Sequence, residues 1–274
     1  MNPPQIIGIV LIKNEDLFIE TVLRNILNFC DRIFVADHHS TDHTQEIVRK
    51  LAAAEPKIDY REVDHVSESH DIIADFAGGP NWVIGVDGDE IYDPERLCRF
   101  REELLTGRYH NTFKVLGNVL NVRYLDNRLH RASGYLAPPC RSMTKLYNFG
   151  AIKSWPAPCP ERLHGGQKVY KAGYSDMSYH RLLDEVVWEE SPFRCLHLCF
   201  QSRSSLDKTG RDQKVAIRKS PAERILWANN IKSFILSRLG LKKDIPYYKK
   251  DFYMRGPIVQ KDIRAFGLDG KIPI

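Results

Sequence analysis

The chain has 274 residues, of which 43% are hydrophobic and 27% are charged, as is ordinary for a folded soluble protein. No apolar run approaches the roughly 20 residues that span a bilayer, and residues 1–5 lack the basic region and long apolar core of a signal peptide. We therefore expect a cytoplasmic chain that forms one large α/β domain, with or without a C-terminal extension.

The net charge of +5 is distributed unevenly along the sequence. Residues 1–110 hold 11 Lys or Arg and 21 Asp or Glu, whereas residues 203–274 hold 17 and 7. An acidic first part suits cation binding. A basic last part suits phosphates, an anionic acceptor or a membrane surface, and the alternative is a solvated basic face.

The six cysteines contain no C-x-x-C pair. Cys195, His197 and Cys199 alternate as on a strand and could be imagined as a zinc site, but a fourth ligand at a recognisable spacing is missing. We therefore expect free thiols in a reducing compartment.

Residues 5–90 alternate between buried-strand runs and helix-spaced segments. The sequence predicts strands at 5–12, 32–37, 58–63 and from 82, and helices over 17–27, through 47–51 and over 67–76. Ser40 or Thr41 is a plausible N-cap of the second helix. This alternation predicts a parallel sheet with right-handed crossovers. Neither G-x-G-x-x-G nor G-x-x-x-x-G-K-[ST] follows the first strand, which speaks against a dinucleotide cofactor or a P-loop.

An apolar run that begins at Trp82 stops abruptly at Asp87-Gly88-Asp89-Glu90. In open α/β sheets, ligands collect beyond the carboxyl ends of the strands. Two carboxylates separated by a glycine can share a hard cation, because the missing side chain lets a phosphate approach. The alternative is an acidic turn without a ligand.

Three blocks, in this order and spacing, resemble family 2 glycosyltransferases of the GT-A fold. They are VLIKNE at 10–15, VADHHSTDHT at 35–44 and WVIGVDGDE at 82–90. They look most like the bacterial branch with K-N-E, D-N-G-S-T-D-G-T and D-A-D-E blocks. His38, His39 and His43 depart from that pattern. They are either solvated turn residues or the lining of the nucleotide pocket, and His39 replaces a glycine that commonly has a positive φ.

The resemblance implies a role for each block. Asp37 would read the base, Asp87 would lie near the ribose and the metal, and Asp89 would bind the metal, which is Mn²⁺ or Mg²⁺. Four further residues would lie beside the nucleotide sugar: Lys13, Asn14, Glu15 and Gly88.

The pattern changes after Asp93-Pro94, which predicts the start of a helix that continues to Leu104. Long strands are predicted at 112–124 and 145–149 without helices between them. The resemblance assigns residues 1–110 to the nucleotide-sugar-binding half and residues 111–203 to the acceptor-side half of a mixed, mainly parallel sheet flanked by helices. Residues 204–274 would form a basic helical C-terminal extension or lid.

Glu161 follows three prolines, at 156, 158 and 160, which fix the backbone before it. The segment resembles the H-E-x-L segment of related lipopolysaccharide-type transferases, with Cys159-Pro160 departing from the usual histidine. The resemblance implies that Glu161 is the general base for the acceptor hydroxyl. The alternative is a surface ion pair between Glu161 and Arg162.

Two later histidines compete as a further metal ligand. His197 lies in a stretch similar to the family's H-x-x-x-R-S neighbourhood and is preferred over His180. A buried structural histidine is the alternative for either.

The extension contains an amphipathic pattern over residues 222–239, for which packing on the main domain is the default. Lysines interleaved with aromatic residues then favour peripheral contact with an anionic membrane surface, at the inner membrane. These lysines are Lys242, Lys243, Lys249 and Lys250. No motif supports binding to nucleic acid.

The sequence thus predicts a metal-dependent inverting glycosyltransferase. The donor would be a nucleotide-diphosphate sugar, and the acceptor a saccharide or a lipid-linked precursor. A nucleotidyltransferase of similar fold and a non-catalytic nucleotide- or carbohydrate-binding protein are the alternatives.

Overall fold

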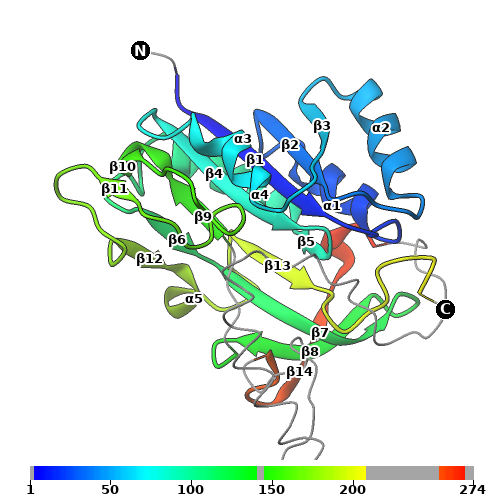
Figure 1. Ribbon diagram of the computed structural model, residues 1–274. Coiled ribbons are helices and arrows are strands. Elements are labelled where there is room, and N and C mark those ends of the chain that lie inside the picture. The colour runs from blue at the N-terminus through cyan, green and yellow to red at the C-terminus, as the bar shows by residue number, and fades with distance from the viewer. Residues whose placement is uncertain (1–2, 141–144, 208–252, 269–274) are drawn as a thin grey trace, which may run out of the picture.

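The computed structural model describes residues 3–140, 145–207 and 253–268 (Figure 1). In chain order the elements are β1 (Gln5–Ile12), α1 (Ile19–Ile26), β2 (Arg32–Asp37), α2 (Thr44–Ala54), β3 (Ile58–Glu62), α3 (Glu68–Ala74), β4 (Asn81–Asp87), β5 (Glu90–Tyr92), α4 (Pro94–Leu105), β6 (Lys114–Leu116), β7 (Asn118–Asp126), β8 (Arg131–Ala137), β9 (Lys145–Asn148), the 3-10 turn η1 (Phe149–Ala151), β10 (Ile152–Ser154), β11 (Val169–Tyr170), β12 (Tyr179–Arg181), α5 (Leu182–Glu185), β13 (Arg194–His197), β14 (Ile258–Asp262) and the 3-10 turn η4 (Arg264–Phe266).

The larger sheet has seven strands in the order β12-β6-β9-β4-β1-β2-β3. Strands β4, β1, β2 and β3 are parallel neighbours, whereas β9 is antiparallel to both β4 and β6. The prediction of a mixed, mainly parallel sheet flanked by helices is confirmed. The four parallel strands come from the first half of the chain, so their carboxyl ends form one continuous edge.

Both faces of this sheet are covered, which explains why its strands are apolar at nearly every position. Successive side chains of a strand point to opposite faces. Ile6, Val10 and Ile12 of β1 accordingly enter one core with α1, α2 and α4, while Ile7, Ile9 and Leu11 enter a second core with α3 and residues 149–163.

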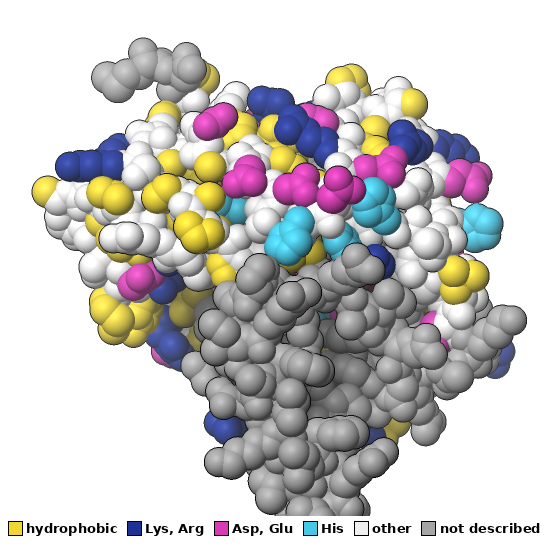
Figure 2. All heavy atoms as spheres, in the orientation of Figure 1, with side chains coloured by type: hydrophobic (Ala, Val, Ile, Leu, Met, Phe, Trp, Pro, Cys, Tyr) yellow, Lys and Arg dark blue, Asp and Glu magenta, His cyan; other side chains and the backbone are white. Residues whose placement is uncertain are grey.

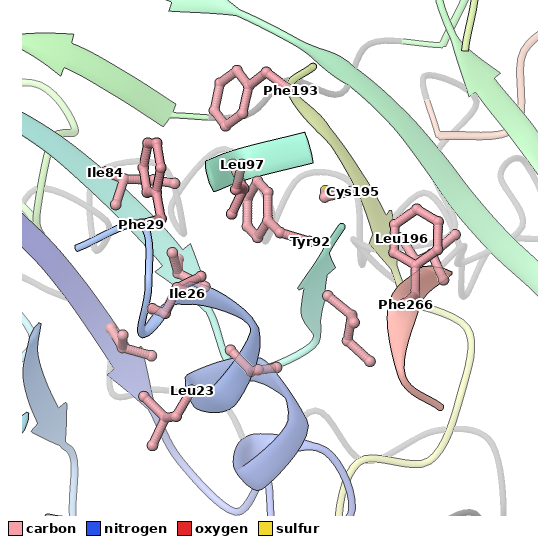
Figure 3. Close-up of a cluster of buried hydrophobic side chains, with 14 of the residues drawn as sticks. Leu23, Ile26, Phe29, Ile84, Tyr92, Leu97, Phe193, Cys195, Leu196 and Phe266 are labelled. Carbon is pink, nitrogen blue, oxygen red and sulfur yellow. The ribbon is translucent and has the colours of Figure 1, made fainter. Parts of the chain in front are cut away.

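The first of these cores also joins the larger sheet to the C-terminal part of the chain. Figure 3 shows Leu23 and Ile26 of α1 in one cluster with Tyr92, Phe193 and Phe266.

The sequence located one helix start correctly and another incorrectly. Asp93 accepts a hydrogen bond from the backbone N–H of Arg96 at 3.1 Å and caps α4, as the Asp93-Pro94 pair predicts. The prediction that Ser40 or Thr41 caps α2 is wrong, because α2 begins at Thr44. Asp42 Oδ1 instead accepts the Thr44 N–H at 2.9 Å.

The single strand predicted over residues 112–124 is divided between two sheets. β6 belongs to the seven-stranded sheet and β7 to a five-stranded sheet of order β14-β8-β7-β13-β5. Gly117 lies at the transfer point, where a Cβ atom would come within 2.1 Å of the Phe193 carbonyl oxygen. No other residue type fits this close approach without a backbone shift.

The five-stranded sheet places the second half of the chain beside the first. β13 pairs in parallel with β7 and antiparallel with β5, so that His197 lies opposite Glu90. β14 adds to the far edge by pairing with β8, and Phe266 stacks on Trp188 with ring centroids 5.9 Å apart.

The described part of the predicted C-terminal extension is therefore a strand and a 3-10 turn. The predicted helix at 222–239 and the lysines at 242–250 lie outside the described residues. The boundary at residue 203 stays a prediction. Within the described ranges, no helix is both long and apolar enough to cross a membrane.

Candidate active site

The sheet register aligns the polar blocks at one edge. Ile12 of β1 lies opposite Asp37 of β2, and Leu11 lies opposite Asp87 of β4. The loops that follow these three strands therefore meet at the same edge, as expected for carboxyl ends of parallel strands. Figure 2 shows Asp and Glu side chains in a row across one face of the molecule, with histidines directly beside them.

Hydrogen bonds connect the loop after β1 to the loop after β2. Asn14 has a φ of 53° and is 8% exposed, its N–H donates to Ser40 Oγ at 2.9 Å, and its Oδ1 accepts the Thr41 N–H at 2.7 Å. The Glu15 N–H donates to Thr44 Oγ1 at 2.8 Å. A short polar side chain suits the left-handed conformation at position 14, because it can bond locally.

Asp37 is fully buried and organises the turn that follows it. Its Oδ1 accepts the Ser40 N–H at 2.9 Å and the Ser40 hydroxyl at 2.7 Å, and its Oδ2 accepts the Tyr60 hydroxyl at 2.8 Å. Burial and the Asp37 carboxylate both raise the pKa of Tyr60, which therefore stays a donor. Tyr60 was not identified from the sequence. The base-reading role of Asp37 stays a prediction.

Each of the three histidines in this loop lies beside a charged side chain, and His43 Nδ1 is 3.5 Å from Glu46 Oε2. His38 is buried, accepts from Lys13 Nζ at Nδ1 (3.2 Å) and donates from Nε2 to the Asp64 carbonyl at 3.1 Å. Burial and the Lys13 charge lower the pKa of His38. His39 has a φ of 52°, the left-handed conformation that is usual for glycine, and its Nε2 lies 2.8 Å from Asp64 Oδ1. That contact raises the pKa of His39.

The turn after β4 packs directly on the loop after β1. A Cβ atom on Gly88 would lie 2.6 Å from Glu15 Cγ, so only glycine fits without displacing Glu15. Asp89 is 2% exposed, and its carbonyl accepts the Leu198 N–H at 2.8 Å. The structure therefore brings Glu15, Gly88 and Asp89 together, as the sequence predicts for the donor side.

His197 is the histidine that approaches this turn. Its Nε2 lies 3.8 Å from Asp89 Oδ1, and its Nδ1 lies 2.8 Å from Asn121 Oδ1 on β7. With the amide oxygen facing the ring, Nδ1 carries the proton and Nε2 presents its lone pair toward Asp89. His180 instead lies 3.1 Å from Glu185 and packs on Tyr109, away from Asp89.

Arg203 is a further cation of the site to which the sequence assigned no role. Its Nη1 lies 2.5 Å from Glu15 Oε1 and 3.6 Å from Asp89 Oδ2. Burial opposes the charged guanidinium, but Glu15 and Asp89 outweigh it and raise the pKa of Arg203. The available signal was its place after His197, in the stretch that resembles the family's R-S pair.

The segment around Arg203 is fastened to the loop after β1. The Leu17 N–H donates to the Arg203 carbonyl at 3.2 Å, and the Ser205 N–H donates to Asp16 Oδ1 at 2.7 Å. The chain after β13 thus crosses the edge of the sheet at the candidate site.

Glu161 lies on a loop that reaches Asp87 through Arg162. The Arg162 guanidinium is 1% exposed and forms an ion pair with Asp87 Oδ1, and its Nη1 lies 3.8 Å from Glu161 Oε1. Glu161 is 30% exposed and its Oε1 also lies 3.1 Å from His164 Nε2. A surface ion pair between Glu161 and Arg162 does not describe this arrangement, because Arg162 is buried.

Comparison with known protein families identifies the family of this chain. The family model for glycosyl transferase family 2 matches residues 9–210, most of the chain. The chain belongs to this family.

Solved structures are similar at low identity. TarS of S. aureus is 19% identical over 56% of this chain and 30% of TarS, with a TM-score of 0.40. Glucosyl-3-phosphoglycerate synthase from Mycobacterium tuberculosis, solved with Mn²⁺, UDP and glucosyl-3-phosphoglycerate, is 19% identical over 58% of this chain and 61% of that enzyme (TM-score 0.35). The mannosyltransferase PcManGT from Pyrobaculum calidifontis, solved with GDP-Man and Mn²⁺, is 16% identical over 91% of this chain and 68% of that one (TM-score 0.40).

The chain thus spans less than two thirds of the length of the first two of these proteins. No curated protein matches the sequence. Similarity at this level does not transfer a substrate or a site residue.

The chain carries the ligand set for a divalent cation only in part. Among residues 3–140, 145–207 and 253–268, no three His, Cys, Asp or Glu side chains come close enough to hold a metal ion, and this includes Cys195, His197 and Cys199. The Asp89 carboxylate and the lone pair of His197 Nε2 nevertheless face each other, and oxygen and imidazole ligands suit Mn²⁺ or Mg²⁺. This pair fits a cation whose other ligands are oxygens of the substrate.

Proposed function

We propose that the protein transfers a sugar from a nucleotide-diphosphate sugar to a hydroxyl group of a saccharide or lipid-linked acceptor, with a divalent cation and inversion at the anomeric carbon. The observation that carries the proposal is the approach of His197 Nε2 to Asp89 at the edge where the loops after β1, β2 and β4 meet. Two charged groups of the departing diphosphate need compensation at such a site.

Asp89 and His197 would hold the cation, and Asn121 would keep the imidazole in the correct tautomer. Asp87 would lie near the ribose and the cation. A bound Mn²⁺ or Mg²⁺ would neutralise charge that develops on the leaving diphosphate. Arg203, which lies between Glu15 and Asp89, adds a fixed positive charge at the same place.

The loops after β1 and β4 would form the donor pocket. Lys13 contacts His38, and the Asn14 N–H donates to Ser40. The absence of a side chain at Gly88 leaves room for the Glu15 side chain. Asp37 would act on the nucleobase of the donor indirectly, by holding the turn that carries His38 and His39.

Glu161 would be the general base. In a single displacement the acceptor hydroxyl attacks the anomeric carbon, its proton passes to the Glu161 carboxylate, and the bond between that carbon and the diphosphate breaks. The carboxylate is partly exposed and lies beside Arg162, which contacts Asp87 on the donor side. A base at Glu161 would therefore be separated from Asp87 by the single side chain of Arg162.

A panel of nucleotide sugars tests the proposal. The protein is incubated with each donor and Mn²⁺, with and without oligosaccharide or lipid-linked acceptors, and released nucleoside diphosphate is measured. We expect release with one donor class, faster in the presence of an acceptor and abolished by EDTA. A nucleotidyltransferase would instead leave every nucleotide sugar intact and release pyrophosphate from a nucleoside triphosphate and a sugar 1-phosphate, supplied in a parallel incubation.

Contact with an anionic membrane is a separate part of the proposal and rests on the sequence of residues 242–250. Each lysine near an anionic surface contributes about 1 kcal/mol at low salt. Co-sedimentation with anionic vesicles should exceed that with neutral vesicles and weaken as salt rises. Equal recovery with both would remove this part.

A further inference from the structure

Arg162 is one of the largest fully buried side chains of the described residues, and it is charged. Its two terminal nitrogens contact two carboxylates from different parts of the chain. Nη2 pairs with Asp87 at the end of β4, and Nη1 lies 3.8 Å from Glu161 Oε1 in the loop before β11. One guanidinium thus connects the donor side and the candidate base.

Stability alone does not account for this arrangement. Burial lowers the pKa of Arg162 to about 9, because the interior disfavours the charged form. Within the described residues, its buried Nε atom has no hydrogen-bond partner. An apolar side chain of similar volume commonly serves stability as well or better than a buried ion pair.

The backbone of Arg162 is held in place independently of its side chain. The Arg162 N–H donates to Ser69 Oγ at 3.0 Å, and His70 Nε2 lies 2.7 Å from the Trp155 carbonyl. Both contacts fasten the loop to α3, which packs on the seven-stranded sheet. The guanidinium is therefore presented from a fixed point.

We propose that Arg162 is a positioning residue that fixes Asp87 for donor binding and Glu161 for proton transfer at the same time. This inference rests on the proposed function of Glu161 and Asp87. Arginine suits the task because its planar group donates in two directions from one charge, whereas lysine has a single compact ammonium. Lysine at this position would not hold both carboxylates in the geometry that the guanidinium sets.

A double-mutant cycle tests both arms. Nucleoside diphosphate affinity with Mn²⁺ is measured by calorimetry, and transfer turnover with the donor and acceptor found above. We expect Arg162→Lys to lower turnover by roughly 10- to 100-fold, the scale of a displacement of about 1 Å at a reacting group. At saturating donor in the Glu161→Gln background, the same change should alter turnover less than about threefold, because the carboxylate that Arg162 positions for proton transfer has gone.

The affinity arm isolates Asp87. Arg162→Lys should weaken nucleoside diphosphate binding several-fold in the wild type and in Glu161→Gln, but not in Asp87→Asn. A merely structural role would lower both quantities by the same factor in every background, and that result would overturn the proposal.

Arg101→Met is the matched control. Arg101 forms a partly buried pair with Asp31 at the opposite end of the parallel strands, with Nη2 and Oδ1 2.6 Å apart. It should reduce thermal stability without changing affinity or turnover. If no donor is turned over by the wild type, the proposed function is wrong, while the affinity arm still tests the contact between Arg162 and Asp87.

Discussion

Asp89 and His197 lie 3.8 Å apart because the strand that follows one pairs with the strand that ends in the other. β5 begins directly after Asp89 and runs antiparallel to β13, with Glu90 opposite His197. The Leu198 N–H also donates to the Asp89 carbonyl at 2.8 Å. Backbone pairing, rather than a flexible loop, therefore sets the distance between the two candidate ligands.

Asp89→Asn should lower turnover about a hundredfold or more, because the variant loses a charge that compensates the cation at the leaving group. EDTA should have the same effect on the wild type. Nucleotide release measured with and without Mn²⁺ checks both. Asp184→Asn, at an exposed carboxylate on α5, should retain full activity. Unchanged turnover of Asp89→Asn would remove the assignment.

His197 and His180 can be separated by metal affinity. Asn121→Leu removes the acceptor that orients the His197 ring, and loss of such a partner weakens metal binding by about 10- to 100-fold. His197→Ala should weaken it further, and His180→Gln should leave it unchanged. Mn²⁺ titration followed by electron paramagnetic resonance measures all three. A loss of Mn²⁺ affinity in His180→Gln alone would make His180, and not His197, the metal ligand.

Glu161→Gln keeps the shape of the side chain but removes the proton acceptor. Transfer to the acceptor should fall by roughly two to four orders of magnitude, the usual scale for a general base. Affinity for nucleoside diphosphate and Mn²⁺ should stay within about twofold, and slow donor hydrolysis should persist. Transfer at the wild-type rate would place the base elsewhere, with Asp176 or Glu185 as the next candidates.

Gly88→Ala should destabilise the protein by about 1–3 kcal/mol, because the new Cβ atom would lie 2.6 Å from Glu15 Cγ and Arg203 holds that side chain. Gly88 is not among the glycines with positive φ, so the cost is one of space. The double variant Gly88→Ala/Glu15→Ala should recover most of the loss relative to Glu15→Ala. Thermal melts of the four proteins give the coupling, and strictly additive losses would contradict it.

His38 should make stability depend on pH. Its pKa is lowered from 6.5 in the folded protein, so below about pH 6.5 the unfolded chain takes up a proton that the folded protein resists. The stabilisation contributed by neutral His38 is therefore present above pH 6.5. It is lost as the pH falls from 6.5 through the lower pKa that His38 has in the folded protein.

The comparison is between melting temperatures at pH 7.5 and 5.5. On acidification, the melting temperature of His38→Gln should fall by less than that of the wild type, because the variant lacks the imidazole whose pKa the fold lowers. His43→Gln, at an exposed position, should behave as the wild type does. Equal losses in His38→Gln and the wild type would refute the assignment.

The parts of the fold predicted correctly are those encoded locally. The β-branched runs at 5–12 and 32–37 became β1 and β2, since a strand buried on both faces is apolar whatever its neighbours are. The split at Gly117 was not predictable in this way, because alternation reads the same in either sheet. The deciding contact is the distant Phe193 carbonyl.

In the candidate site, too, the residues in local sequence blocks were predicted and those that depend on distant contacts were not. Residues in contiguous blocks, such as Asn14 and Asp89, were identified because strand ends and short spacings are visible in sequence. Tyr60, Arg203 and the burial of Arg162 depend on contacts between segments far apart in the chain. For Arg162, the only sequence signal was its position next to the candidate base Glu161.

The position of β14 affects how the C-terminal region can be studied. Because β14 completes the five-stranded sheet and Phe266 packs in the core beside Trp188, truncation after residue 207 would remove part of the folded domain. Loss of activity in such a truncation would report on folding. Internal replacements within 208–252 that keep residues 253–268 would separate a lid or a membrane contact from the integrity of the enzyme.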